Sequence, residues 1–261
     1  MSILKILFLN FLFFFFLQPI FSAQNMHGFD KPNFKNKFVV GKSKYSNGEI
    51  FNNCYVYAKN VLIEQNDVGL KGEAKIFIKE YSKLNNISQL CKTNSGLIKH
   101  VFQSEGYYDG KINDFLIIKG ADSHGAAYKF QIYKILSKDV RLIFEHIRHI
   151  DKEFLFLKKS NRIVSLRYWA KLNNEINCSL FNKNSFHECK KKLLKLNNIN
   201  SETELDFKEC QSLFHDRSVD SSFYKFEERD MQFFVKMELP DIQNPKNFKI
   251  IDPKLKCEIA P

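Results

Sequence analysis

The chain has 261 residues, of which 44% are hydrophobic, and a formal net charge of +11. A chain of this length can form one large domain or two small ones, each with a packed core. The basic excess favours acidic partners such as an anionic surface, but the positive residues are spread along the sequence, so nucleic acid is not the expected partner.

The first 23 residues are predicted to be an export signal. Lys5 precedes a run over residues 6–17 that is apolar except for Asn10, which is the order of a basic region followed by a hydrophobic region. The run is shorter than the roughly 17 to 25 apolar residues that a membrane-spanning helix needs. We expect cleavage after Ala23, and the alternative is an uncleaved anchor formed by residues 1–21, which would be the chain's only membrane contact.

Residues 24–261 are predicted to form a single exported α+β domain, with a division near residue 176 as the alternative. Short apolar runs of the β type occur from Phe38 to Ile78, and glycines between them indicate turns. The spacing then becomes helical, from Leu84 to Cys91 and again from Leu97 to Phe102. One or two helices are therefore expected to interrupt the strands there.

The clearest β region is an antiparallel meander over about residues 115–170, where apolar and polar residues alternate in successive runs. A helical hairpin follows over about 186–214, because Ser185 with Glu188 and Ser201 with Glu204 both fit capping boxes. Residues 223–226 and 231–237 are predicted to form a final strand pair. The prolines after residue 239 predict an irregular tail.

All six cysteines lie beyond the predicted signal and are disulfide candidates, since thiols of exported proteins meet oxidising conditions. They are Cys54, Cys91, Cys178, Cys189, Cys210 and Cys257. If the two helices of the hairpin are antiparallel, Cys189 and Cys210 lie at the same end, so we predict a bond between them. The export signal and the cysteines together predict a location in a periplasm, on a cell surface or outside the cell.

Two histidine-containing patterns give little evidence for a catalytic or metal site. The segment Asp122-Ser123-His124-Gly125 holds the residue types of a nucleophilic triad, but a triad assembles across the fold, so we interpret it as a turn. His146 and His149 could share a metal only on a helix, and here they follow a strand pattern, so we expect them to diverge.

Two further patterns resemble metal sites only in residue type. His187 and Cys189, with Cys210 and His215, could supply zinc ligands, but paired cysteines in an exported chain are better read as a disulfide. The turn over residues 109–114 offers oxygen ligands without the alternating frame of a calcium loop. No P-loop or dinucleotide fingerprint is found, and no catalytic, cofactor or metal site is predicted.

The sequence therefore favours an exported, non-enzymatic binding or interaction protein whose partner is an anionic surface or another protein. The alternative is a small secreted hydrolase whose site assembles only in three dimensions. Its candidate bases are His100, His124, His146 and His149, and it requires one of them to meet a carboxylate and a hydroxyl in a cleft.

Overall fold

The computed structural model describes residues 28–70, 72–80, 87–92, 98–104, 106–124, 126–137, 139–159, 164–173, 186–200, 204–213 and 231–259. The predicted export signal and Cys178 lie outside these residues, as do the expected strand at 223–226, Ser185, Ser201 and His215. Side-chain positions are not described for residue 80, residues 98–103 or residues 122–124, which include His100 and His124.

The first sheet is a five-stranded antiparallel meander in chain order. Its strands are β1 (Phe34–Lys42), β2 (Glu49–Val56), β3 (Asn60–Asp67), β4 (Ala74–Glu80) and β5 (Ile98–Ser104). The short helix α2 (Ile87–Lys92) confirms one predicted helix. The prediction of a helix over residues 97–102 is wrong, because residues 98–104 form β5, which pairs with β4. The short apolar run of this segment fits both the helical and the strand period, and its pairing with β4 makes it a strand.

The second sheet has eight strands in the order β13-β12-β11-β9-β8-β7-β6, and β10 pairs with β11 beside this path. The strands are β6 (Tyr107–Ile112), β7 (Phe115–His124), β8 (Ala127–Ile135), β9 (Val140–His149), β10 (Phe154–Lys158), β11 (Val164–Leu172), β12 (Met231–Leu239) and β13 (Lys249–Ile259). The predicted antiparallel β-rich α+β fold is confirmed. A division near residue 176 would separate β11 from β12, which pair along their length, and the number of domains stays a prediction.

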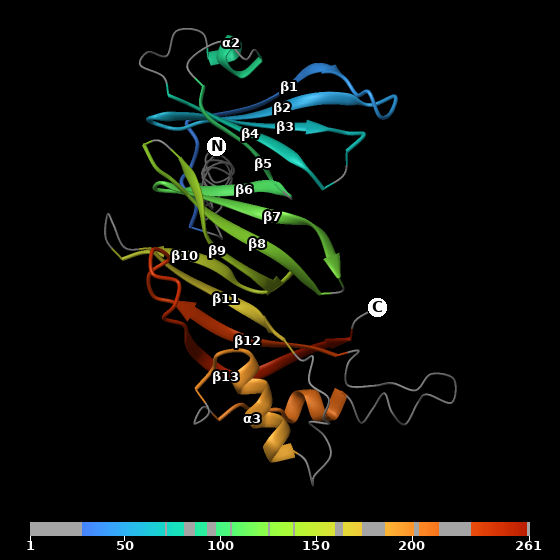
Figure 1. Cartoon of the computed structure of the whole chain (residues 1–261), viewed down its shortest axis with the longest axis vertical. Coiled ribbons are helices and arrows are strands. Elements are labelled where there is room, and N and C mark those ends of the chain that lie inside the picture. The colour runs from blue at the N-terminus through green and yellow to red at the C-terminus, as the bar shows by residue number, and fades with distance from the viewer. Residues whose placement is uncertain are drawn as a thin grey trace, which may run out of the picture.

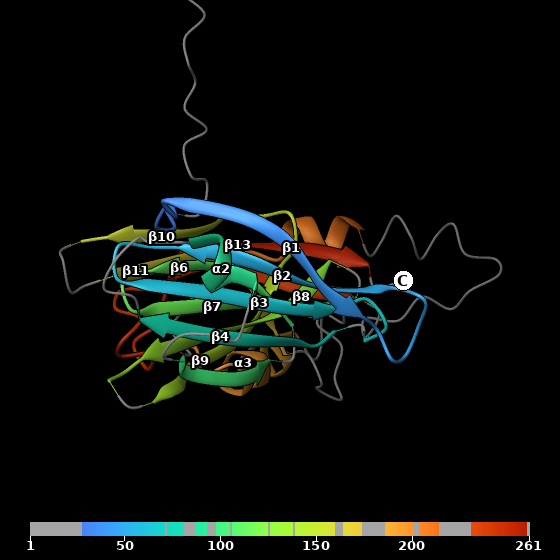
Figure 2. The ribbon, with the colours of Figure 1, turned by 90° about the horizontal axis from the view of Figure 1, so that it is seen from above.

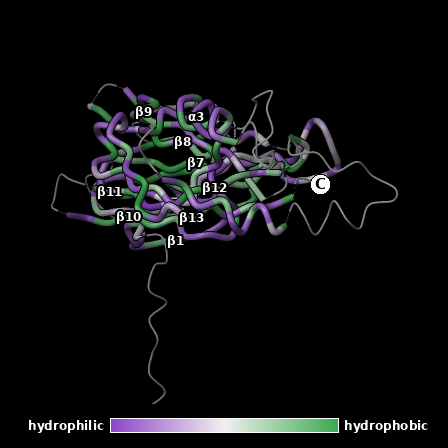
Figure 3. The backbone as a smooth tube through the Cα atoms, turned by 90° about the horizontal axis from the view of Figure 1, so that it is seen from below, coloured by the Kyte–Doolittle hydropathy of each residue, from purple (hydrophilic) through white to green (hydrophobic). Residues whose placement is uncertain are grey.

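The molecule is built in layers from α2 at one end to α3 (Phe186–Leu196) at the other (Figure 1). The first sheet lies on β6 to β9, and the strands of both run in similar directions when seen from above (Figure 2). Leu62 and Leu116 belong to the core between them. Hydrophobic and hydrophilic stretches alternate along the strands (Figure 3), as expected for sheets whose faces differ in burial.

The largest core joins β6 to β9 with β10 to β13 and with the helices. Its centre is aromatic: the ring of Phe130 lies 5.0 Å from that of Phe154 and 5.2 Å from that of Tyr168. Leu193 of α3 is buried in the same core. The edge-to-face arrangement of these rings is the geometry that aromatic pairs prefer.

The helical region differs from the predicted hairpin in its second half. α3 begins and ends as predicted, but residues 204–207 are extended and the second helix is described only from residue 208 to residue 213. Asp206 forms a parallel bridge with Lys254 of β13, and its carboxylate accepts a hydrogen bond from the Lys208 backbone amide, 3.0 Å away. Asp206 therefore both ties this segment to the sheet and caps the helix.

The tail after residue 239, predicted to be irregular, contains β13 instead, which pairs with β12. Pro253 lies within this strand. β13 is the last strand of the sheet, and an edge position with irregular register tolerates a residue that has no amide hydrogen.

The structure contains disulfides, but the predicted bond between Cys189 and Cys210 is wrong. Cys210 is bonded to Cys257 of β13, and Cys54 of β2 is bonded to Cys91 of α2. Cys189 is disulfide-bonded as well, to a partner outside the described residues.

The physical reason for this error is the pairing of the second helix with β13, because the bridge from Asp206 to Lys254 brings Cys210 beside Cys257. Phe186, which starts α3, packs on Phe207, which directly precedes the second helix, with ring centroids 5.6 Å apart. The starts of the two helices therefore lie close together. An antiparallel hairpin would instead place the start of one helix beside the end of the other.

Candidate interaction surface at the end of the first sheet

Two turns of the first sheet pack side by side. The β1–β2 turn is closed by a 2.9 Å hydrogen bond from the Ser43 amide to the Gly48 carbonyl, and the Val68 amide of the β3–β4 turn donates to the Glu49 carbonyl at 3.2 Å. At Gly69 a Cβ atom would lie 2.9 Å from the Cβ of Tyr45. The close approach of the two turns therefore requires glycine at position 69.

Four large hydrophobic side chains of the first sheet and its two turns are exposed. Val39 is 58% exposed, Tyr45 68%, Val68 54% and Leu70 37%. These four are half of the large hydrophobic residues that are exposed in the described part of the chain. Val39 pairs with Phe51 across β1 and β2, and Phe51, Val68 and Leu70 line the groove described next. We call the four exposed side chains and this groove the apolar end.

A groove of about 460 Å³ continues the apolar end between the first sheet and β6. Phe51, Val68, Leu70 and Tyr107 form most of its apolar lining. Lys37 of β1 lies over the Phe51 ring, with its ammonium nitrogen 3.6 Å from the ring centroid. The groove is thus aromatic inside and carries a cation at its edge.

The groove also holds buried polar groups. Glu64, only 3% exposed, accepts hydrogen bonds from the Asn53 side chain at 2.9 Å and from the Tyr108 amide at 2.8 Å. Asn66 is 6% exposed, and its Oδ1 atom has no hydrogen-bond partner among the described residues. A buried acceptor without a donor costs about 1 to 3 kcal/mol, so this side chain of the groove lining is destabilising as it stands.

Three tyrosines behind the groove are held in their neutral form. Burial raises the pKa of Tyr108 well above its ordinary value, and it also raises the pKa values of Tyr55 and Tyr57. The hydroxyls of Tyr57 and Tyr108 are 2.6 Å apart and share a hydrogen bond. These phenols provide a rigid, uncharged wall and are not poised for proton transfer at neutral pH.

The two candidate histidines of β9 meet different neighbours. The His146 ring stacks on Phe144, with centroids 6.0 Å apart, and its Nδ1 lies 3.0 Å from the Ile147 carbonyl. Burial lowers its pKa. His149 is 3% exposed and lies against Phe234. Since residues three apart on a strand lie on opposite faces, the two rings share no ligand.

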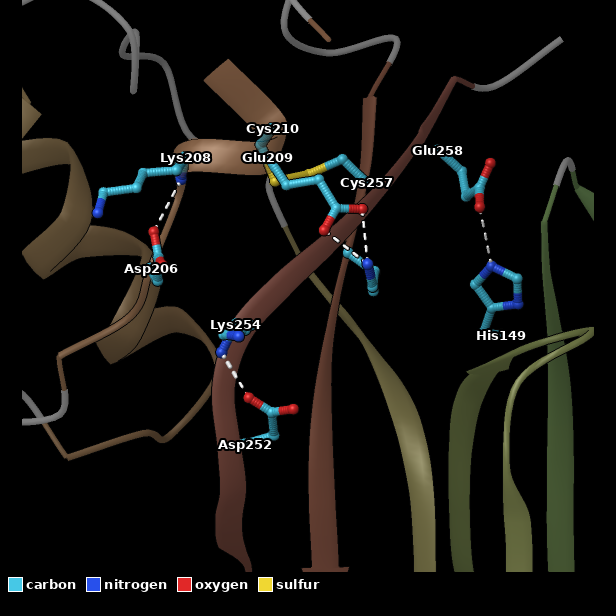
Figure 4. A network of polar contacts seen from close by, with 10 residues as sticks. His149, Asp206, Lys208, Glu209, Cys210, Asp252, Lys254, Cys257 and Glu258 are labelled. Carbon is cyan, nitrogen blue, oxygen red and sulfur yellow. Dashed lines mark hydrogen bonds and ion pairs between the residues drawn. A yellow bond between two sulfur atoms is a disulfide. The ribbon is translucent and has the colours of Figure 1, made fainter. Parts of the chain in front are cut away.

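His149 is the described histidine that most resembles a catalytic base. Its Nε2 lies 3.2 Å from a carboxylate oxygen of Glu258 (Figure 4). Its Nδ1 accepts a 3.1 Å hydrogen bond from the Asp151 amide, so the proton resides on Nε2 and points at Glu258. Both ring nitrogens are engaged, and no hydroxyl is among their hydrogen-bond partners in the described structure.

The same region shows how β13 anchors the second helix. The Cys210–Cys257 bond is flanked by Glu209, whose two carboxylate oxygens accept hydrogen bonds from Lys256 at 2.8 and 2.6 Å (Figure 4). Cys189 and Cys210 are both in disulfides, so neither offers a thiolate to zinc.

The remaining candidate segments are parts of the sheet. Residues 122–124 belong to β7 rather than to the predicted turn, with Ser123 opposite Tyr128 of β8. Residues 109–112 belong to β6, and Asn113 takes a positive φ of 51° in the following turn. Among the described residues, no cluster of three or more histidine, cysteine, aspartate or glutamate side chains could hold a metal ion.

Sequence reasoning missed the apolar end. The segment Val68-Gly69-Leu70 carried a usable signal, because it places two apolar side chains in a glycine-containing turn, where polar residues are usual. That signal does not show that the other turn lies beside it.

No protein-family model, no curated protein and no solved structure matches this chain. Within the described ranges, every helix is too short or too polar to span a lipid bilayer. The apolar end is therefore the feature from which a function can be inferred.

Proposed function

We propose that this is an exported, non-enzymatic binding protein that engages another protein through the apolar end. The observation that carries the proposal is the exposure of Val39, Tyr45, Val68 and Leu70, of which Val68 and Leu70 line an aromatic groove. Contiguous exposed apolar surface beside a polar rim is typical of protein interaction sites, and buried aromatic residues are the usual anchors of such interfaces.

Export is supported by the disulfides and by the amino-terminal sequence pattern. Disulfides persist in oxidising compartments and are rare in the cytosol, and residues 1–23 fit a cleavable signal. Amino-terminal sequencing of the protein from its native host is expected to start near Gln24. A sequence that begins at Met1 or Ser2 would contradict cleavage.

Binding is tested with the mature protein immobilised at physiological salt and exposed to envelope or extracellular material from the native host. The double variant Val68→Asp/Leu70→Asp places charge on the apolar end. The control Ile251→Asp changes a side chain of β13 that is 39% exposed, close to the exposure of Leu70. We expect the wild type and the control to retain a partner that the double variant loses.

The readout separates a specific partner from general stickiness. Equal capture by all three proteins, or no capture above background by the wild type, counts against the proposed surface. Because both substitutions lie at exposed positions, folding is checked by near-ultraviolet circular dichroism, which should match the wild type in each variant.

A further inference from the structure

Arg148 of β9 is a buried cation far from the apolar end. It is 4% exposed, and its guanidinium carbon lies 4.2 Å from the ring centroid of Tyr128 and 3.9 Å from that of Phe154. Such contacts stabilise a desolvated cation, but the cost of burying an ion is larger than they supply. The aromatic contacts alone therefore leave much of this cost uncompensated.

The hydrogen bonds of Arg148 leave one edge of the guanidinium without an acceptor. Nη1 donates to the His149 carbonyl at 3.3 Å. Nε is shielded from solvent and has no acceptor among the described residues. Nη2 lies 4.0 Å from the nearest carboxylate oxygen of Asp109, which is too long for a hydrogen bond. The edge formed by Nε and Nη2 thus has neither of the acceptors that a buried guanidinium needs.

A second cation lies beside the same ring. The ammonium nitrogen of Lys119 on β7 is 4.7 Å from the Tyr128 centroid. Asp109 is the one carboxylate within ion-pair distance of Arg148 in the described structure, so the local charge is positive. The Asp109 side chain is 24% exposed, so solvent reaches the carboxylate that lies nearest to Arg148.

We propose that the Nε–Nη2 edge of Arg148 binds a small oxyanion, that is, a carboxylate or a phosphate group. Two parallel N–H donors in one plane match two oxygens of such a group. The two rings occupy stacking positions over the guanidinium, so an acceptor must approach in its plane. Bound oxygen atoms would satisfy Nε and offset the excess positive charge.

The test uses the full mature protein and inorganic phosphate or acetate as separate probes, with sodium chloride adjusted to constant ionic strength. Isothermal titration calorimetry measures affinity, and thermal unfolding provides a second readout. We expect at least one probe to bind and to raise the melting temperature. Tighter binding of phosphate assigns the site to phosphate groups, and tighter binding of acetate assigns it to carboxylates.

Variants separate this site from general charge effects. Arg148→Lys keeps the charge but loses the planar fork, and it should weaken binding roughly tenfold. Asp109→Asn removes a competing carboxylate and should strengthen binding. The control Arg141→Lys, on the same strand with a side chain that is 69% exposed, should leave affinity unchanged.

Two results would overturn the proposal. One is a wild-type protein whose stability and heat of titration respond to neither probe. The other is an Asp109→Asn variant that loses stability and gains no affinity, since Asp109 would then be the counter-ion of Arg148. Because Asp109 lies at the rim, this variant tests the site even if Arg148→Lys fails to fold.

Discussion

The carboxylate of Glu238 on β12 accepts a 2.9 Å hydrogen bond from the ammonium of Lys159, which follows β10. Arg167 of β11 approaches the same carboxylate, with Nε 3.4 Å from its second oxygen. Glu238 is 9% exposed, whereas the side chains of Lys159 and Arg167 are 45% and 40% exposed, so the cluster joins three segments of the second sheet around a shielded carboxylate. Screening by water is weaker there than at an exposed ion pair.

Glu238→Gln is expected to lower the free energy of unfolding at pH 7 by about 1 to 2 kcal/mol. The hydrogen bond from Lys159 holds the pKa of Glu238 below its ordinary value of 4.5. Its stabilisation is therefore present above pH 4.5 and is lost as the pH falls through the lower pKa of the folded state. Urea unfolding from pH 7 to pH 3 should show the two proteins converging.

The matched control is Glu209→Gln, which also removes a carboxylate bonded to a lysine. The Glu209 side chain is 53% exposed, so the loss at pH 7 should stay within about 0.5 kcal/mol. Equal losses in the two variants would contradict the role assigned to burial at Glu238.

His146 is expected to make stability depend on pH in the mildly acidic range. Burial lowers its pKa from 6.5, so below pH 6.5 the unfolded chain takes up a proton more readily than the folded chain does. Stability should therefore fall as the pH drops below 6.5, by up to about 1.4 kcal/mol for each pH unit. His146→Gln should flatten this slope in urea unfolding between pH 7 and pH 5.

The control for the origin of this pH dependence of stability is His187→Gln. His187 lies on α3 at an exposed position, and its replacement should leave the slope as in the wild type. If His146→Gln kept the full slope, another group would be responsible for it.

Local patterns predicted most of the fold. The strands from Phe115 to Leu172 were predicted from a continuous apolar run and from segments that alternate, and α3 was predicted from its capping residues. β5 was mistaken for a helix because its apolar run fits both periods, and the choice depends on its partner β4. β13 was missed because Pro253 argues against a strand unless its edge position is known.

The candidate site could not be predicted because it depends on distant contacts. The two turns of the apolar end are joined only through the register of β2 with β3, and the groove also needs Tyr107 of β6. The disulfide pairing also depends on distant contacts. Cys210 and Cys257 are 47 residues apart and meet because β13 lies beside the second helix. Sequence spacing alone cannot choose among such pairings.

Disulfide mapping tests this arrangement of the chain. A peptide map without reduction should join Cys54 to Cys91 and Cys210 to Cys257. The double variant Cys210→Ser/Cys257→Ser should lose about 4 kcal/mol of stability, because a loop of this length is no longer closed in the unfolded state. A peptide that joins Cys189 to Cys210 would contradict the attachment of the second helix to β13.

Gly106 controls the passage of the chain from the first sheet to the second. It lies between β5 and β6 with a φ of +146°, and a Cβ atom there would come 2.1 Å from the Lys119 carbonyl oxygen. Gly106→Ala combines a disfavoured backbone angle with a clash against rigid backbone, and it should cost about 3 kcal/mol. At Gly41 a Cβ atom would lie 3.8 Å from Ile50, so Gly41→Ala should leave stability unchanged or raise it by up to about 1 kcal/mol. Urea unfolding of the two variants compares them directly, and equal stabilities would show that the junction can shift to accept a side chain.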